Sequence, residues 1–329
     1  MNQRLALRTS FLLAGCALFV YLLVRLGPGD IAALVVQTGW YFAWMCLAFA
    51  GHQLVRAAAF SKCVTAVKRP SYWDLVRIRL SGEAVQYLTF TGPFLAEPAK
   101  ALLLKTRGSD LTHAFAATIS EYLFYLFTSA AMTLAGLYYL IGNAGISGPL
   151  LVAARIVATI AGAFLLTAAF AIAGRVYLIG AVVKAIGKLP AIGKRLRIDP
   201  HTLRETEDLL FVLLRARPGR FVSILGIEFV AQALLILEVF LFLKSMGTPF
   251  PILDSLLIEA AGKFIGLGFF FVPAQIGVAE GAYSLIFQGL GFSATAGFGL
   301  ALARRFRSLL IAAAGLLLLP QWSGGAMVR

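Results

Sequence analysis

Long apolar segments separated by short turns follow one another along the 329-residue chain. A helix that spans a bilayer needs roughly 20 apolar residues. The short alternating segments typical of a membrane barrel are absent from the sequence. The pattern therefore predicts an all-α polytopic membrane protein. Six segments are expected to span the bilayer, at about residues 11–26, 40–60, 111–141, 150–183, 221–243 and 294–319.

Two further apolar segments are interrupted where a simple span would continue. One break contains Pro273, Gly277 and Gly281, and the break upstream contains Pro93. Proline removes a backbone donor, and a backbone group left unpaired in hydrocarbon costs several kcal/mol. These four residues are therefore predicted to break helices where the chain faces the protein interior or a wet cavity.

Each break is expected to form the tip of a re-entrant hairpin. The first hairpin, about residues 74–104, is followed by Lys105 and Arg107, so it opens from the cytoplasm. The second, about residues 252–290, is followed by an uncharged turn and opens from outside. A bent helix pair on the inner membrane surface is the alternative for the first hairpin. The same charge rule places both termini in the cytoplasm.

Composition agrees with a membrane protein and changes the interpretation of the charge. The chain is 60% hydrophobic and 13% charged, with a mean hydropathy of +0.86, whereas a soluble domain carries roughly 25% charge. The net charge of +14 would suit nucleic acid, but the basic residues cluster in loops between apolar segments. Such clusters are typical of cytoplasmic loops and attract anionic lipids, so nucleic acid is not expected as a partner.

The longest polar region, residues 184–220, carries nine basic and four acidic residues. It is predicted to be a cytoplasmic linker, and leucines recurring on one face indicate an amphipathic helix within it. The three cysteines form no CxxC pair, and the three histidines lack the spacing of metal ligands. No catalytic motif is present either. The sequence therefore predicts no metal, no cofactor and no enzymatic activity.

An internal repeat emerges when the second break is placed on the first, at an offset of 183 residues. The single membrane domain, residues 1–329, then divides into repeat one at about 38–146 and repeat two at about 221–320. Opposite hairpin orientations would make the copies inverted, as in secondary transporters. Chance similarity between apolar helices is the alternative. Identical pairs are Glu97 and Glu280, Ala99 and Ala282, Leu102 and Leu285, Gly108 and Gly291, Thr112 and Thr295, and Phe115 and Phe298.

Ionisable residues inside apolar segments are costly, and they usually pair or face water. Three arginines begin about ten residues into the last span, roughly 15 Å deep, so they need partners. Glu280, Glu97 and Glu121 are the candidates, while Glu259 and Lys263 lie four residues apart and are placed to pair locally. These charges either only hold helices together or bind a charged head group. The candidate binding residues are Glu97, Glu280, Arg304, Arg305, Lys263, Glu121, Arg307, Glu83 and Glu259.

Two glycine motifs, Gly262 to Gly266 and Gly277 to Gly281, have the spacing that lets helix backbones approach closely. In the binding interpretation Lys263, Arg304 and Arg305 hold phosphate. The acids neutralise these bases when the site is empty, or titrate in proton coupling.

Several of these motifs together resemble a known family. Glu97-Pro98-Ala99-Lys100 after Pro93, then Gly277-Val278-Ala279-Glu280-Gly281 and Arg304-Arg305-Phe306-Arg307, resemble the lysylphosphatidylglycerol synthase transmembrane region, or flippase-like family. The last part of the chain is also similar to hopanoid-biosynthesis-associated members. The resemblance implies a bacterial inner-membrane protein that moves or handles a polar lipid. Leu95-Ala96 stand where a Gly-Gly pair is usual in the family.

Three functional hypotheses follow. The first is a lipid flippase that binds a polar head group in a charged midplane cavity. The second is a non-catalytic membrane partner of a lipid or glycan biosynthetic enzyme, docked through the basic linker. The third is a membrane-embedded lipid-modifying transferase, although members that make aminoacylated lipid carry a soluble catalytic domain that is not expected here. A phospholipid or other polar lipid is the expected partner, and a homo-oligomer is left open.

Overall fold

The computed structural model describes residues 38–65, 70–89, 93–143, 148–174, 176–177, 200–215, 218–247, 249–268 and 278–318, together with residues 29 and 36. Every regular element in this part of the chain is an α-helix, which confirms the predicted all-α class. The ten described helices are α3 (Trp40–Cys63), α4 (Tyr72–Leu88), α5 (Pro93–Lys105), α6 (Leu111–Asn143), α7 (Gly148–Gly174), α9 (Pro200–Arg215), α10 (Pro218–Ser245), α11 (Ile252–Gly268), α12 (Val278–Gly289) and α13 (Ala294–Leu318).

The hydrophobic pattern located these helices to within a few residues in most cases. α3, α6, α10 and α13 coincide with four expected spans, and α9 lies where the amphipathic helix was predicted. The fourth span was drawn too long, because α7 ends at Gly174. The first expected span, 11–26, lies outside the described residues.

Two described segments, Ala154–Gly174 in α7 and the whole of α10, are long and apolar enough to cross a membrane by length and composition. α13 is also long, but three arginines near its middle make it more charged than these two segments. Charge inside a long apolar helix is therefore the feature that the fold must accommodate.

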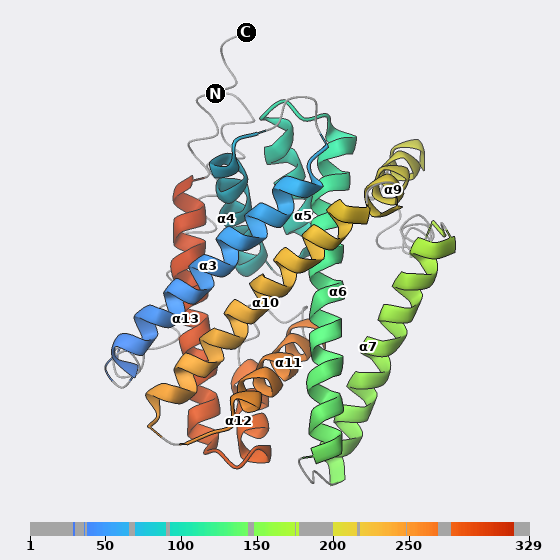
Figure 1. The fold of residues 1–329 in the computed structure, drawn as a ribbon. Coiled ribbons are helices and arrows are strands. Elements are labelled where there is room, and N and C mark those ends of the chain that lie inside the picture. The colour runs from blue at the N-terminus through green and yellow to red at the C-terminus, as the bar shows by residue number, and fades with distance from the viewer. Residues whose placement is uncertain are drawn as a thin grey trace, which may run out of the picture.

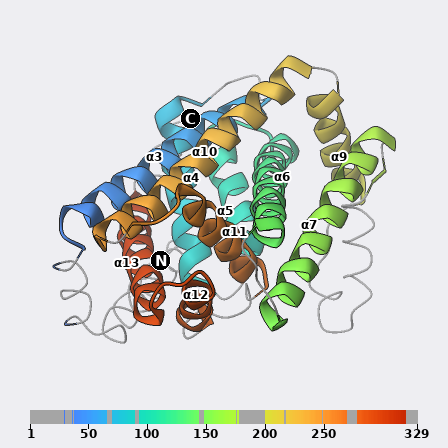
Figure 2. The ribbon, with the colours of Figure 1, turned by 60° about the horizontal axis from the view of Figure 1, so that its bottom comes forward.

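The helices form a bundle in which α3 and α10 lie side by side and run in opposite directions (Figure 1). α4 packs against α13, and α11 packs against α6. The pair α4 and α5 lies in the upper half of Figure 1, and the pair α11 and α12 lies in the lower half. α7 packs along α6 and, with α9, stands at one edge of the bundle (Figure 2).

Close helix approach depends on two glycines. A Cβ added to Gly315 of α13 would overlap the backbone carbonyl of Leu80 in α4, and a Cβ on Gly262 of α11 would overlap the Tyr283 hydroxyl of α12. Gly262 belongs to one of the two glycine motifs, but its neighbour is the end of the Tyr283 side chain and not a backbone atom, so the close backbone approach expected within the second hairpin stays a prediction. Gly266 is the last glycine of that motif and lies within α11.

The break residues have different outcomes. Pro93 is the first residue of α5, where its missing N–H leaves no intrahelical bond unmade. Pro273 and Gly277 lie outside the described residues. The prediction that Gly281 breaks the chain is wrong, because α12 begins at Val278 and continues through it. Glycine keeps its backbone N–H, and its cost inside a helix is only about 1 kcal/mol.

Candidate functional site

Charged side chains from the α3–α6 and α10–α13 helices, most of them buried, form a network of ion pairs through the bundle. Among the described residues it contains equal numbers of bases and acids, and every member is paired within 4 Å of an opposite charge. The seven bases are Arg56, Arg79, Lys100, Lys263, Arg304, Arg305 and Arg307, and the seven acids are Glu83, Glu97, Glu121, Glu228, Glu238, Glu259 and Glu280.

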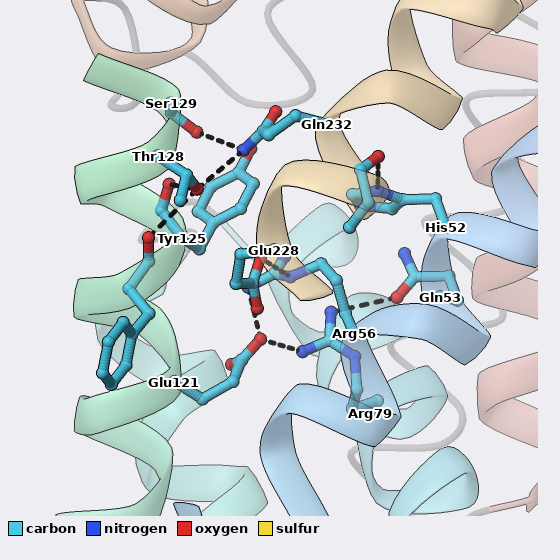
Figure 3. A network of polar contacts seen from close by, with 12 residues as sticks. His52, Gln53, Arg56, Arg79, Glu121, Tyr125, Thr128, Ser129, Glu228 and Gln232 are labelled. Carbon is cyan, nitrogen blue, oxygen red and sulfur yellow. Dashed lines mark hydrogen bonds and ion pairs between the residues drawn. The ribbon is translucent and has the colours of Figure 1, made fainter. Parts of the chain in front are cut away.

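Glu121 of α6 is the centre of the first group. Its side chain is fully buried, and its Oε1 atom lies 2.5 Å from Arg56 Nη2 of α3 and 2.5 Å from Arg79 Nη1 of α4. Lys100 Nζ of α5 lies 3.3 Å from its Oε2 atom. One carboxylate therefore joins four helices, and Figure 3 shows it pointing from α6 toward α3.

The bases around Glu121 have further partners that fix their positions. Lys100 Nζ lies 2.7 Å from Glu97 Oε1, which is three residues earlier on α5. Arg79 Nη2 donates to Gln53 Oε1 at 3.0 Å and lies 3.5 Å from Glu83. Because each base is held from two sides, the first hairpin is fastened to α3 and α6 by charge as well as by packing.

A second group surrounds the arginines of α13. Arg304 pairs with Glu259 of α11, lies 3.6 Å from Glu238 of α10, and donates to the Tyr283 hydroxyl at 2.6 Å. Arg307 Nη1 lies 2.5 Å from the same Glu238 carboxylate. α13 is therefore tied to α10, α11 and α12 through its charged middle.

Tyr125 of α6 connects the two groups. Lys263 Nζ of α11 donates to the Tyr125 hydroxyl at 3.1 Å and lies 3.3 Å from Glu259. The guanidinium of Arg56 lies 3.9 Å from the centre of the Tyr125 ring, close enough for a cation–π contact. The ring is thus in contact with one base from each group, and the network is continuous from α4 to α13.

The sequence found most members of the network but misassigned several pairs. Glu280 pairs with Arg305, as expected, and Glu259 pairs with Lys263. Glu97 and Glu121 were also candidate partners for the α13 arginines, but they pair with bases of α3, α4 and α5. The sequence shows how deep a charge lies in its span, but it does not show which helices are neighbours, and that decides which charges meet.

Other members were not predicted as site residues. They are Arg56, Arg79, Lys100, Glu228, Glu238 and the aromatic residues Tyr125 and Tyr283. The signal available for Glu228 and Glu238 was two carboxylates inside a 28-residue apolar helix, since such residues are functional candidates by default.

The network side chains are arranged as pairs of opposite charge. Within the described helices no group of three or more histidine, cysteine or acidic side chains is placed to hold a metal ion. In this conformation the network bases are occupied by carboxylates. Two surface hollows, of about 430 and 480 Å³, are lined by other residues, on α7 and between α3, α4 and α10. An anionic ligand would therefore have to displace carboxylates from the bases.

Comparison with known proteins agrees with the membrane character of the fold. No curated protein and no solved structure matches the chain. A family model does match, over residues 9–315, and it covers every described helix except the last three residues of α13. Membership of this family associates the chain with membrane lipids. The chain belongs to the lysylphosphatidylglycerol synthase TM region family.

Proposed function

We propose that this protein is a flippase-like transporter of the bacterial inner membrane that carries a polar lipid head group past its buried charged network. The observation that carries the proposal is the network itself, in which seven bases and seven acids form ion pairs within the bundle of a membrane protein. Charges of this kind inside a membrane cost a few kcal/mol each on insertion scales, so their number calls for a function beyond holding helices together.

An inverted repeat would provide the moving parts. At the offset of 183, α3 corresponds to α10, α4 to α11, α5 to α12 and α6 to α13. Exchanging these names converts the α4–α13 contact into the α11–α6 contact and leaves the α3–α10 contact unchanged. Any twofold axis has this effect on helix packing, and the opposite directions of α3 and α10 favour an axis that lies across these helices, in the membrane plane.

The turns and cores agree with the same correspondence. Gly108 and Gly291 both have positive φ, of 92° and 84°, and their amides bond to Lys105 and Gln288 at 3.0 and 3.1 Å. Buried residues of the two hydrophobic cores also correspond at this offset. These pairs are Ala59 and Phe242, Phe60 and Leu243, Leu104 and Phe287, and Ala117 and Leu300.

One polar contact occurs at equivalent positions in the two halves but between different residue types. Glu121 of α6 meets Lys100 of α5 at 3.3 Å, and at the same offset Arg304 of α13 meets Tyr283 of α12 at 2.6 Å. The first half therefore places a carboxylate where the second half places a guanidinium. A zwitterionic or anionic head group that passes between the halves meets both signs of charge, which suits a polar lipid.

Transport of this kind needs no covalent step and no cofactor. The head group replaces carboxylates as the partner of Arg304 and Lys263, and the carboxylates re-form their pairs once the lipid has left. An inward-opening and an outward-opening hairpin would give access from the two leaflets in turn. The lipid tails stay in the bilayer throughout.

The test is lipid movement in vesicles that contain the purified full chain. We expect labelled phospholipid to exchange between leaflets, and Arg304→Ala to abolish the exchange while helical content and elution volume are retained. Arg107→Ala is the matched control, because it removes an arginine from a 3.2 Å ion pair with Asp74 outside the network. Equal exchange by the protein and by Arg304→Ala would overturn the proposal.

A further inference from the structure

Glu228 of α10 is the least compensated acid in the network. Its side chain is fully buried, yet within the described part of the chain neither carboxylate oxygen accepts a hydrogen bond. The nearest cation is Arg56 Nε, at 3.5 Å. Glu121 is equally buried but has three bases within 3.3 Å.

The closest contacts of Arg56 are with residues other than Glu228. Its Nη2 atom lies 2.5 Å from Glu121, its guanidinium covers the ring of Tyr125, and its Nε atom makes no hydrogen bond within the described helices. A buried carboxylate without hydrogen bonds is costly, and a bound proton removes that cost. The geometry therefore favours an uncharged Glu228 in this conformation.

The charges around Glu228 have opposite effects on its ionisation, so a small movement of one of them would change its protonation state. The negative charge of Glu121 disfavours ionisation of Glu228, and the nearby positive charges favour it. If Arg56 moved from Glu121 toward Glu228, the carboxyl would release its proton. The titratable and charged groups that interact with Glu228 are Arg56 and Cys63 from α3, Arg79 from α4, Glu121 from α6, and Lys263 from α11.

Protonation of Glu228 also changes the charge of the network as a whole. With every member ionised, the seven bases and seven acids balance. A proton on Glu228 leaves one positive charge without a counterpart. A lipid phosphate diester carries one negative charge, so it would restore neutrality.

We propose that Glu228 binds a proton and thereby couples proton uptake to the binding of a monoanionic lipid phosphate. The inference rests on the proposed transport function and names its coupling ion and its class of substrate. One proton enters with one phosphate diester, both leave on the other side, and no bond of the lipid changes. Glu228 acts on the lipid through Arg56 and Lys263, so it is a positioning residue.

The protonation state is tested first, by infrared spectroscopy of the full chain in lipid nanodiscs. The difference between the protein and Glu228→Gln should contain the C=O band of a protonated carboxyl at neutral pH, and the band should disappear as the pH is raised. Glu121→Gln is the matched control, and its difference spectrum should show a carboxylate. If no protonated band is assigned to Glu228 at any pH at which the protein stays folded, the inference is overturned.

The coupling is tested in vesicles of phosphatidylcholine that contain either labelled phosphatidylglycerol or labelled phosphatidylcholine. One coupled proton permits an accumulation ratio of up to about tenfold per unit of pH gradient. The gradient should drive accumulation of the anionic lipid and not of the zwitterionic one, and Glu228→Gln should exchange lipid without responding to the gradient. Exchange of the anionic lipid that ignores the gradient in the unaltered protein would overturn the coupling. Absence of all lipid movement would overturn the transport function as well, while the infrared band would still decide whether Glu228 is protonated.

Discussion

Glu121 shows what a single buried charge does in this protein. Three bases from three helices converge on its carboxylate, and the side chain is fully buried. Removal of one partner from a buried pair costs about 3–5 kcal/mol, because the opposite charge is left uncompensated. We expect Glu121→Gln to lower the free energy of unfolding by an amount in this range, measured by thermal unfolding of the detergent-solubilised chain.

Glu83→Gln is the control for that change. Glu83 belongs to the same group, but its side chain is 23% exposed and lies 3.5 Å from Arg79. Exposed pairs contribute only about 0–1 kcal/mol, so its melting temperature should stay close to that of the unaltered protein. Equal losses from both substitutions would show that the partners of Glu121 do not act as described.

The residue scale is also where sequence and structure differ most. An acid or base inside an apolar run is visible in the sequence, and most network members were recognised in this way. Their partners were not, because helices that are apolar on nearly every side lack the polar face that would define their rotation. Glu238 illustrates this, since it lies on an apolar helix and receives both Arg304 and Arg307 of α13.

At the scale of the helix, local chemistry decided how much could be predicted. Pro93 begins α5 at the predicted break, and α4 begins within two residues of the predicted start at 74. Its cap was not predicted: Ser71 accepts the Asp74 amide at 3.1 Å. The end of α7 at Gly174 was missed, because apolar residues continue beyond it. Gly281 was misread because a glycine resembles a break in sequence although helical hydrogen bonds can pass through it.

Gly315 should control the approach of α13 to α4. An added Cβ would overlap the backbone carbonyl of Leu80, which cannot move aside as a flexible side chain would. We expect Gly315→Ala to destabilise the protein by about 1–3 kcal/mol in thermal unfolding, the usual cost of overpacking. Gly281→Ala is the matched control, since nothing lies within 4 Å of its added Cβ. It should be neutral or stabilise the helix by up to about 1 kcal/mol. A stable Gly315→Ala would contradict the close helix contact.

Gly108 and Gly291 make a paired prediction about the two hairpins. Both have positive φ, at 92° and 84°, in the turn that follows α5 or α12. Alanine at either position should cost about 1–2 kcal/mol, because a Cβ clashes with the following carbonyl in this conformation. Similar shifts in melting temperature for Gly108→Ala and Gly291→Ala are expected. Sensitivity at only one position would show that the two turns are not equivalent.

For the whole molecule, the decisive property is the side of the membrane on which each hairpin opens. Asp110 and Ser293 are exposed, lie just before α6 and α13, and correspond at the offset of 183. They also cap these helices, Asp110 by accepting the Thr112 amide at 3.0 Å and Ser293 by accepting the Ala296 amide at 3.2 Å. An inverted repeat would therefore place these two equivalent positions on opposite membrane faces.

That arrangement is testable by labelling in intact bacterial cells. In a background with Cys16, Cys46 and Cys63 replaced by alanine, a membrane-impermeant thiol reagent should modify the Ser293→Cys protein in intact cells. The Asp110→Cys protein should react only after the inner membrane is opened, because the charge pattern predicts that its hairpin opens toward the cytoplasm. Both substitutions remove an equivalent cap, so a difference in folding cannot explain a difference in labelling. If both positions react from the same side, the two halves are not inverted, and a head group would have no alternating route through the charged network.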